Sequence, residues 1–326
     1  MKGGIVLVLR DPLANDEPPR ETVLTIGNFD GVHLGHQDIL RKVVERAHQL
    51  SAPATAMTFD PHPAKVLRPK DAPRLLTTLG QKLELLGRYG IEVALVVPFT
   101  HRLRRMAASE FVRRALVDRL AVREVYIGEG FRFGADREGN VELLQSMGAE
   151  AGFSAHGMPS VQDGPELVSS TRVRRLVAHG RVDEAGRLLG RVLYADGRVF
   201  RGERLGRRLG FPTLNTQLEN ELFPARGVYV TAVFIPSFER TFPAVTNIGV
   251  RPTVYENYST TVESHLLDFS ADVYHEDVRL FFLHQLRDER VFSSPMALVA
   301  QIRRDVELAR AWFDAHPLSS WELVTP

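Results

Sequence analysis

The residues that could do chemistry lie in two glycine-rich strings, and the first string reads GNFDGVHLGH at residues 27–36. Glycines 27, 31 and 35 allow tight turns and let a bound group approach the backbone closely. The string follows an apolar run and opens a helical pattern, and the free amides and dipole of a helix start favour an anion. His33 and His36 could donate hydrogen bonds to charge that develops at phosphorus. The string therefore predicts a phosphate site without lysine.

Other interpretations of these two histidines stay open. Histidines at i and i+3 on a helix can bind a metal ion, although no third ligand lies near them in the sequence. A dinucleotide fingerprint would read G-x-G-x-x-G, which this string does not match. The histidines can also be plain structural residues at a strand–helix turn.

Other segments of the first half also suit a phosphate or a planar ring. Residues 169–172 (SSTR) combine hydroxyl caps for a helix start with a guanidinium, which predicts a second phosphate clamp; the alternative is an ordinary helix cap. Phe131 and Phe133 could stack on a ring at the end of a strand, or pack in the core. In Asp60-Pro61-His62-Pro63 two prolines stiffen a loop after a strand, where ligands bind.

The second string, GERLGRRLGFPTLN, occupies residues 202–215. Glycines spaced through an arginine-rich loop suit the wrapping of a polyphosphate by backbone amides. The Thr213 hydroxyl and the Asn215 amide oxygen are hard oxygen ligands suited to Mg²⁺. Taken alone, the string can also be a polar turn with basic flanks.

Alternating strands and helices must position the first string. Strands are predicted at 22–27, 54–59, 93–97 and 124–128, and helices at 36–50, 77–89, 109–120 and after Gly139. This order predicts a parallel sheet wrapped by helices through right-handed crossovers. Ligands in such sheets bind outside the carboxyl ends of the strands.

The pattern changes near residue 190. Two short helices are predicted at 171–179 and 182–189, ended by Gly180 and Gly190. Strands rich in β-branched and aromatic residues follow at 191–200, 228–234, 242–248, 261–267 and 278–283, with a last helix at 296–313. An antiparallel barrel or sandwich closed by a helix is expected.

Composition limits the function classes. A length of 326 residues predicts two domains, because single cores rarely exceed ~250–300 residues. The absence of cysteine excludes disulfides, thiolate metal sites and thiol nucleophiles. A net charge of +1 gives no general attraction to nucleic acid or anionic membranes, and the apolar run Ile5–Leu9 is too short for a signal peptide. We expect a cytoplasmic protein with neither a nucleic-acid nor a membrane partner.

Lysine usage adds a chemical limit. The lysines are Lys2, Lys42, Lys65, Lys70 and Lys82, so the chain after residue 82 contains none. No Walker-type Gly-Lys-Ser/Thr loop is present, and no lysine in the later part can form a Schiff base. Phosphates bound there need arginine, backbone amides, helix N-termini or a metal ion.

Residues 27–37 resemble the N-terminal module of the bacterial bifunctional riboflavin kinase/FAD synthetases, which belongs to the nucleotidylyltransferase superfamily. Further matching segments follow in order: 58–63 (TFDPHP), 76–77 (LT), 109–112 (SEFV), 128–134 (GEGFRFG) and 169–172 (SSTR). In the second half, residues 210–215 (GFPTLN) resemble the riboflavin kinase domain. Its other matching segments are 227–229, 247–253, 262–267, 286–287 and the helical region that ends at Asp305.

The resemblance implies ATP-dependent phosphorylation of riboflavin to FMN by a C-terminal β-barrel. It implies adenylation of FMN to FAD, with release of pyrophosphate, by an N-terminal Rossmann-like domain. ATP is then a co-substrate of both reactions, Mg²⁺ is the expected cofactor, and ADP is the other product of the kinase. The expected domains are residues 1–188 and 189–326.

The resemblance also implies residue roles. Catalytic roles fall to Glu263, as general base on the ribityl 5′-hydroxyl, and to His33, His36 and Arg172. The implied nucleotide and phosphate contacts are Gly27, Asn28, Phe29, Asp30, Gly35, Ser169, Ser170, Thr171, Gly202, Gly206, Arg207 and Gly210. The implied flavin contacts are Asp60, Pro61, His62, Phe131, Phe133 and Arg251, and the implied Mg²⁺ ligands are Thr213 and Asn215.

Two positions depart from the family pattern. Gly130 stands where Asn or Asp usually precedes Phe131, which removes one expected substrate contact. Leu214 replaces the usual alanine between Thr213 and Asn215. The first departure keeps one alternative open, a kinase whose adenylyltransferase domain is weak or inactive. A flavin-sensing module without turnover is a separate alternative, against which His33, His36 and Glu263 weigh.

Overall fold

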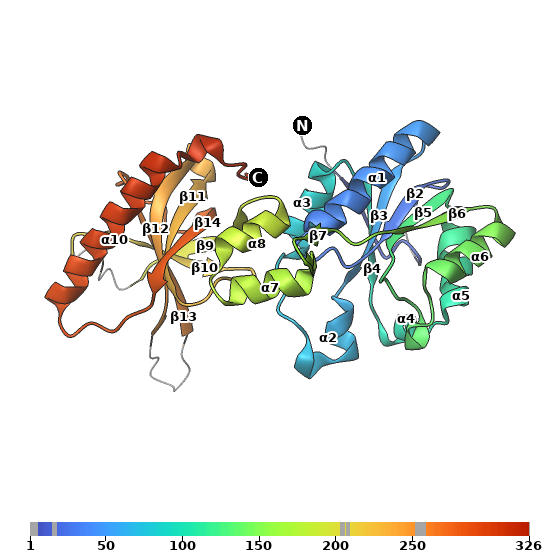
Figure 1. The fold of residues 1–326 in the computed structure, drawn as a ribbon, viewed down its shortest axis with the longest axis horizontal. Helices are drawn as coiled ribbons and strands as arrows, with labels where there is room; N and C mark the ends of the chain where they lie inside the picture. Colours follow the sequence, from blue (N-terminus) through green and yellow to red (C-terminus); the bar gives the residue numbers. More distant parts are fainter. Residues whose placement is uncertain (1–5, 15–17, 203–205, 207–208, 252–258, 326) are drawn as a thin grey trace. The chain divides into compact units, whose positions relative to one another are not determined.

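The structure is a computed structural model that describes residues 6–14, 18–202, 206, 209–251 and 259–325. The chain forms two compact units, Met1–Ser170 and Thr171–Pro326. Figure 1 shows a sheet flanked by helices in the first unit and a barrel with a long helix in the second.

The first unit is built on a six-stranded sheet in the order β1-β4-β3-β2-β5-β6. Its strands are β1 (Leu7–Arg10), β2 (Val23–Ile26), β3 (Ala54–Asp60), β4 (Val93–Pro98), β5 (Glu124–Gly128) and β6 (Ser154–Met158). All neighbouring strands are parallel, which confirms the predicted sheet. The order reverses at β2, which lies between β3 and β5. Such a switch point, at the carboxyl ends of the strands, is where open parallel sheets bind ligands.

Helices cover this sheet because their apolar positions recur at helical spacing. They are α1 (Leu34–Leu50), α2 (Pro63–Leu67), α3 (Leu79–Arg88), α4 (His101–Arg104), α5 (Ala108–Phe111) and α6 (Val141–Ala151). The helix predicted at 109–120 continues beyond α5 as a π-helical segment, Val112–Arg119. Leu24, Leu95 and Val125 are fully buried in the core beneath these helices. A short hairpin of β7 (Gln162–Asp163) and β8 (Glu166–Leu167) follows.

The second unit contains a closed barrel in the order β10-β13-β12-β11-β14-β9. Its strands are β9 (Leu193–Phe200), β10 (Leu214–Leu218), β11 (Gly227–Ile235), β12 (Arg240–Arg251), β13 (Ser259–Leu266) and β14 (Asp277–Asp288). Every pair is antiparallel, and the pairing of β9 with β10 closes the barrel. This confirms the barrel and excludes the sandwich.

The described helices that accompany the barrel strands in sequence are α7 (Ser170–Ala178), α8 (Val182–Leu189) and α10 (Pro295–Ala315). Helix α8 contacts β9 and β14, and α10 lies along β11, β12 and β14 (Figure 1). The Arg287 guanidinium on β14 donates to the buried Asp305 carboxylate on α10, with Nη2–Oδ2 at 2.7 Å. A buried bidentate pair fixes both elements in one register. The predicted domain limits, 1–188 and 189–326, stay a prediction.

None of the helices in the described part of the chain is long and apolar enough to cross a membrane.

Candidate active sites

The first glycine-rich string forms a tight loop between β2 and α1. Phe29 and Val32 have positive φ angles of 49° and 40°, a strained backbone for residues with side chains. Both side chains are buried, with exposures of 1% and 0%, so the core holds the strained turn in place. A Cβ on Gly27 would meet the Phe29 ring at 3.0 Å, which explains a glycine at this position.

His33 and His36 lie together at the start of α1, as the sequence predicted. Their rings stack with centroids 3.7 Å apart and planes 18° apart, and Phe29 contacts the His36 ring edge-on. A Cβ on Gly35 would meet the His33 ring at 3.3 Å, so glycine leaves room for the stack. The first turn of α1 contains no acidic residue. No side chain of this first turn therefore offsets the positive end of the helix dipole.

The metal alternative for these histidines gains no support. Across the described ranges of the chain, no three His, Asp or Glu side chains gather in a way that could hold a metal ion.

The buried side chain of Asp30 anchors the loop between β2 and α1. Its side chain is 1% exposed, and its carboxylate accepts hydrogen bonds from the Leu76 amide at 3.0 Å, the Thr77 amide at 3.2 Å and the Thr77 hydroxyl at 3.3 Å. The Thr77 hydroxyl also accepts from the Gly31 amide at 3.2 Å. The Asp30 carboxylate thus joins the glycine loop to the segment before α3.

The predicted phosphate clamp at 169–172 begins beside the same loop. The Ser170 hydroxyl donates to the Asp30 carbonyl at 3.0 Å. Ser169 is half-buried just before it. Thr171 and Arg172 follow on α7, where Thr171 is exposed and Arg172 half-buried. The clamp segment is therefore tied to the glycine loop through the Ser170 hydroxyl.

The predicted flavin contacts at 60–62 follow the carboxyl end of β3. Asp60 and Pro61 are exposed and joined by a cis peptide bond. His62 is 9% exposed, and its Nδ1 accepts the Ala64 amide at 3.1 Å as the N-cap of α2. The His62 imidazole is therefore engaged in ordering its own helix.

Phe131 and Phe133 follow the carboxyl end of β5. Their rings stack with centroids 6.1 Å apart, and both half-buried side chains pack against the hydrophobic core. Phe133 also meets Phe111 at 5.8 Å. Beside them Gly130 is exposed, and a Cβ there would meet nothing within 4 Å. The side chain missing at Gly130 would have had room.

Lys82 is a residue of this site that the sequence reasoning missed. The last lysine of the chain sits on α3 with only 5% of its surface exposed. Its Nζ donates to the Thr58 hydroxyl at 3.4 Å, and that hydroxyl donates to the Asn28 carbonyl at 3.3 Å. Burial lowers the pKa of the Lys82 ammonium, while the charges of Asp30 and Asp60 oppose that shift. Lysine is almost never buried without a partner, but this burial becomes visible only in the structure, so the sequence held no signal for Lys82.

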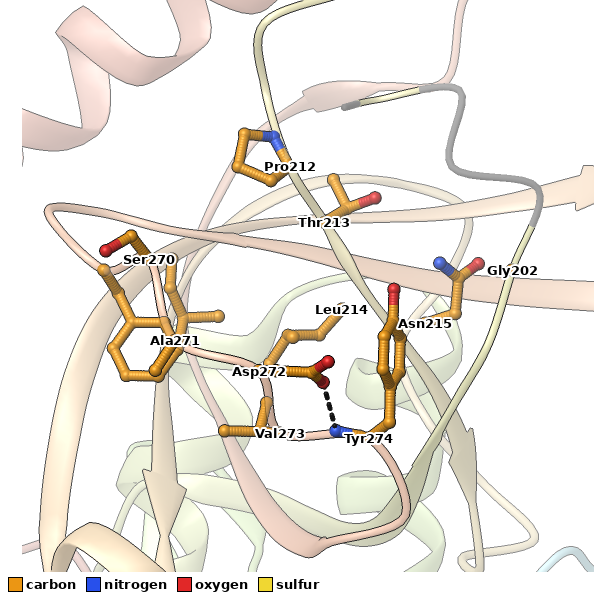
Figure 2. A pocket seen from close by; sticks show the side chains of 12 residues that line it. Gly202, Pro212, Thr213, Leu214, Asn215, Ser270, Ala271, Asp272, Val273 and Tyr274 are labelled. Carbon is orange, nitrogen blue, oxygen red and sulfur yellow. Dashed lines mark hydrogen bonds between the residues drawn. The ribbon is translucent and has the colours of Figure 1, made fainter. Parts of the chain in front are cut away.

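The second site is a cavity of about 320 Å³ at the barrel. Figure 2 shows the strap at 212–215 on one side and the loop at 270–274 on the other. Thr213 and Asn215, the predicted Mg²⁺ ligands, both line it, as does Gly202. The Tyr274 amide donates to the Asp272 carboxylate at 3.1 Å, which orders the facing loop.

The glycines of the second string approach the same two side chains. A Cβ on Gly202 would meet the Asn215 amide group at 2.6 Å, and a Cβ on Gly206 would meet the Thr213 hydroxyl at 3.1 Å. Gly210 is exposed with φ 88°. Arg207 lies outside the described residues. Glycine is therefore required where the loop passes over Thr213 and Asn215.

Glu263 lies beside Asn215 in the barrel. In the strand register Asn215 of β10 pairs with Glu263 of β13, and Glu263 pairs with Asn247 of β12. Paired residues share a face of the sheet, so three polar side chains stand in a row next to the cavity. Asn247 belongs to a matched segment, but the sequence reasoning gave it no role. The Arg251 side chain lies outside the described residues, although its backbone ends β12.

Comparisons with known proteins match a different enzyme family to each of the two parts of the chain that carry these sites. A model of the FAD synthetase family matches residues 15–172, and a model of the riboflavin kinase family matches residues 189–313. The bifunctional riboflavin kinase/FMN adenylyltransferase of Pseudomonas fluorescens is 42% identical over 292 residues, 90% of this chain and 93% of that protein. The chain belongs to this family.

A second bifunctional riboflavin kinase/FMN adenylyltransferase, from Escherichia coli K12, is 39% identical over 296 residues, covering 91% of this chain and 94% of that protein. The C-terminal part is the riboflavin kinase and the N-terminal part is the FMN adenylyltransferase. ATP is the co-substrate of these transferase activities. The function predicted from the two motif sets is confirmed.

The fold has a solved counterpart over both units. A crystal structure titled as a macrolide-efflux protein from Streptococcus pneumoniae superposes with a TM-score of 0.86 at 30% sequence identity. It covers 94% of this chain and 99% of its own. The word efflux describes the Streptococcus pneumoniae protein.

Proposed function

We propose that Glu263 is the general base of the riboflavin kinase. The Glu263 carboxylate takes the proton from the ribityl 5′-hydroxyl of riboflavin as that oxygen attacks the γ-phosphorus of ATP, and ADP leaves. The row Asn215–Glu263–Asn247 beside the cavity is the observation that carries this proposal. We propose that ATP occupies the cavity, with its phosphates against Gly202, Gly206 and Gly210. Arg207 would add charge to the same loop.

Thr213 and Asn215 suit a Mg²⁺ ion that accompanies ATP. Both supply neutral oxygen atoms, and Mg²⁺ accepts a few such ligands when substrate phosphates and water provide the others. Gly202 and Gly206 lie close to the Asn215 and Thr213 side chains, so these side chains would lie beside the proposed position of the ATP phosphates. When bound, the ion neutralises phosphate charge. By holding the ion, Thr213 and Asn215 would orient the ATP phosphates relative to Glu263.

For the adenylyltransferase, we propose direct in-line transfer without a covalent intermediate. An oxygen of the FMN phosphate attacks the α-phosphorus of ATP, and pyrophosphate leaves. The stacked His33 and His36, the amides of the Gly27–Gly35 loop and Arg172 would stabilise the charge on the transferring group. Ser169, Ser170 and Thr171 would bind the nucleotide phosphates from the other side.

The remaining residues would position the substrates. Asp30 would act through the loop that it anchors, with Asn28 and Phe29 shaping the loop that the nucleotide meets. The proposed flavin contacts of the N-terminal part are Asp60, Pro61, His62, Phe131 and Phe133, and Arg251 would meet flavin in the kinase. Both reactions would take place in the cytoplasm.

The two activities of one chain provide the test. Glu263→Gln should abolish conversion of riboflavin to FMN and leave conversion of FMN to FAD nearly unchanged, whereas His36→Asn should do the reverse. Separated flavins from reactions with ATP and Mg²⁺ give both rates. Glu219→Gln, at an exposed position after β10, is the matched control and should change neither rate. Loss of both activities in a folded variant would contradict the two-site assignment.

A further inference from the structure

The strap that carries Thr213 runs beyond the end of a β-ladder. The pairing of β10 with β13 consists of Leu214 with Ser264 and Asn215 with Glu263. Continuing this register places Thr213 opposite His265 and Pro212 one position further on. Proline has no N–H to donate to a ladder. The backbone pairing that orders Leu214 and Asn215 therefore ends before Thr213 and Pro212, which line the same cavity.

Where the backbone pairing ends, the His265 imidazole contacts the strap. Its Nδ1 lies 2.8 Å from the Pro212 carbonyl oxygen. A carbonyl oxygen can only accept, so Nδ1 carries the proton and donates it. His265 stands two residues from Glu263 on β13, and successive side chains alternate between faces, so both project from the same face of the strand. One strand thus carries the proposed base and the anchor of the strap.

A ring contact strengthens this attachment. The Phe211 ring meets the His265 ring edge-on, with centroids 5.5 Å apart and planes 81° apart. The Phe211 amide donates to the Gly206 carbonyl at 2.8 Å. His265 therefore holds the strap by its ring and by its N–H, and Phe211 links it onward to Gly206.

We propose that His265 is a positioning residue of the riboflavin kinase, which fixes Pro212 and so holds Thr213 in place beside Glu263. This inference rests on the proposed kinase site. It assigns His265 no contact with substrate; the imidazole acts through the position of the strap. Because Pro212 is exposed and His265 half-buried, water competes for the hydrogen bond, and the expected effect is a reduction rather than a loss of activity.

A matched pair of substitutions separates the hydrogen bond from the volume of the side chain. His265→Asn keeps an N–H on the atom bonded to Cγ, the place that Nδ1 occupies in histidine, whereas His265→Leu fills similar space without a donor. The Leu variant should lower kcat/KM for riboflavin phosphorylation by about tenfold, equal to about 1.4 kcal/mol. The Asn variant should stay within about threefold of the parent chain. FMN adenylation by the same molecules should not change.

A second measurement does not depend on turnover. Hydrogen–deuterium exchange of peptides covering residues 211–215 should accelerate in His265→Leu and stay near the parent rate in His265→Asn. Unchanged kinetics and unchanged exchange in the Leu variant would overturn the positioning role. An Asn variant as impaired as the Leu variant would also overturn it, because the hydrogen bond would then not be the cause.

Thr213→Val distinguishes failure of this inference from failure of the proposed site. If Thr213→Val leaves riboflavin phosphorylation intact, the proposed kinase site is wrong, and the role of His265 falls with it. If Thr213→Val abolishes phosphorylation while His265→Leu has no effect, only the positioning role is wrong.

Discussion

The two units hold their proposed phosphate loops by opposite means. In the first unit a buried carboxylate, Asp30, accepts hydrogen bonds from the Leu76 and Thr77 amides and the Thr77 hydroxyl. In the second unit a half-buried imidazole, His265, donates one hydrogen bond to the Pro212 carbonyl. An acceptor that gathers several buried donors is costly to lose, while a single donor at the surface is partly replaced by water. The first loop is therefore expected to be the more sensitive of the two.

The largest effect should follow from Asp30→Asn. The amide removes the charge, and its NH2 group replaces Oδ2, which accepts from the Leu76 amide at 3.3 Å, so two donors face each other there. FMN adenylation should fall by about 100-fold, and the first unit should lose roughly 2–4 kcal/mol of unfolding free energy. Flavin assays and calorimetry measure the two effects, with riboflavin phosphorylation as the internal reference. Asp38→Asn, at a half-buried position on α1 paired with Arg41, should leave adenylation unchanged.

The corresponding disturbance of the second loop is Gly202→Ala. The added Cβ would lie 2.6–2.7 Å from the Asn215 amide group and displace it. Riboflavin phosphorylation should fall by about tenfold, mainly through a higher KM for ATP. Gly80→Ala on α3 places its Cβ 3.8 Å from the nearest atom and serves as the control. Normal kinase kinetics in Gly202→Ala would remove Asn215 from the proposed site.

Lys82→Met should separate activity from stability. Loss of the buried ammonium removes the donor to Thr58, so adenylation should fall by about fivefold, whereas the melting temperature should not fall. Burial lowers the pKa of Lys82. Below that folded-state pKa the buried charge costs stability, and the cost is relieved as pH rises through it toward 10.5.

The pH dependence supplies the measurement for Lys82. In the parent chain, the ratio of adenylation to phosphorylation should drop in alkaline solution before pH 10.5, the ordinary lysine value. The Met variant should lack this drop, and Lys42→Met, at a half-buried position on α1, should keep it. An unchanged profile in Lys82→Met would leave the lysine with a packing role alone.

The smallest effect expected is a gain. Gly130→Asn places a polar side chain where nothing lies within 4 Å of the Cβ, so the change should not strain the turn. We expect the rate of FMN adenylation to rise by about twofold. A comparison with Gly130→Ala isolates the contribution of the amide. No gain would mean that the missing side chain is not what limits this adenylyltransferase.

Sequence patterns predicted strands where apolar residues run together or where β-branched and aromatic residues alternate with polar ones. β2, β3, β4 and β5 were recognisable for the first reason, because strands buried on both faces of a parallel sheet are almost continuously apolar. β10 was not predicted: its sequence, LNTQL, mixes polar residues that owe their burial to the barrel around them. The register that places Asn215 beside Glu263 depended on that strand.

In the candidate sites too, residues close together in the sequence could be predicted, and residues brought together by the fold could not. The pairing of His33 with His36 could be predicted from their spacing on one helix, and Thr213 and Asn215 from one short string. Lys82 and Asn247 could not, because each reaches its site across strands from a distant part of the sequence. The anchoring of Asp30 depends on Leu76 and Thr77, 46 and 47 residues away.

The closure of the barrel also decides where aggregation can begin. Closure of the barrel leaves few unpaired strand edges among the described residues, so the second unit offers little template there for pairing with another chain. The first unit's sheet is open, and its edges are β1 and β6. β1 is only four residues long and ends at Arg10, features that discourage edge-to-edge pairing. A truncation that removed β1 would expose the edge of the longer, apolar β4, which could then pair with a strand of another chain and cause aggregation.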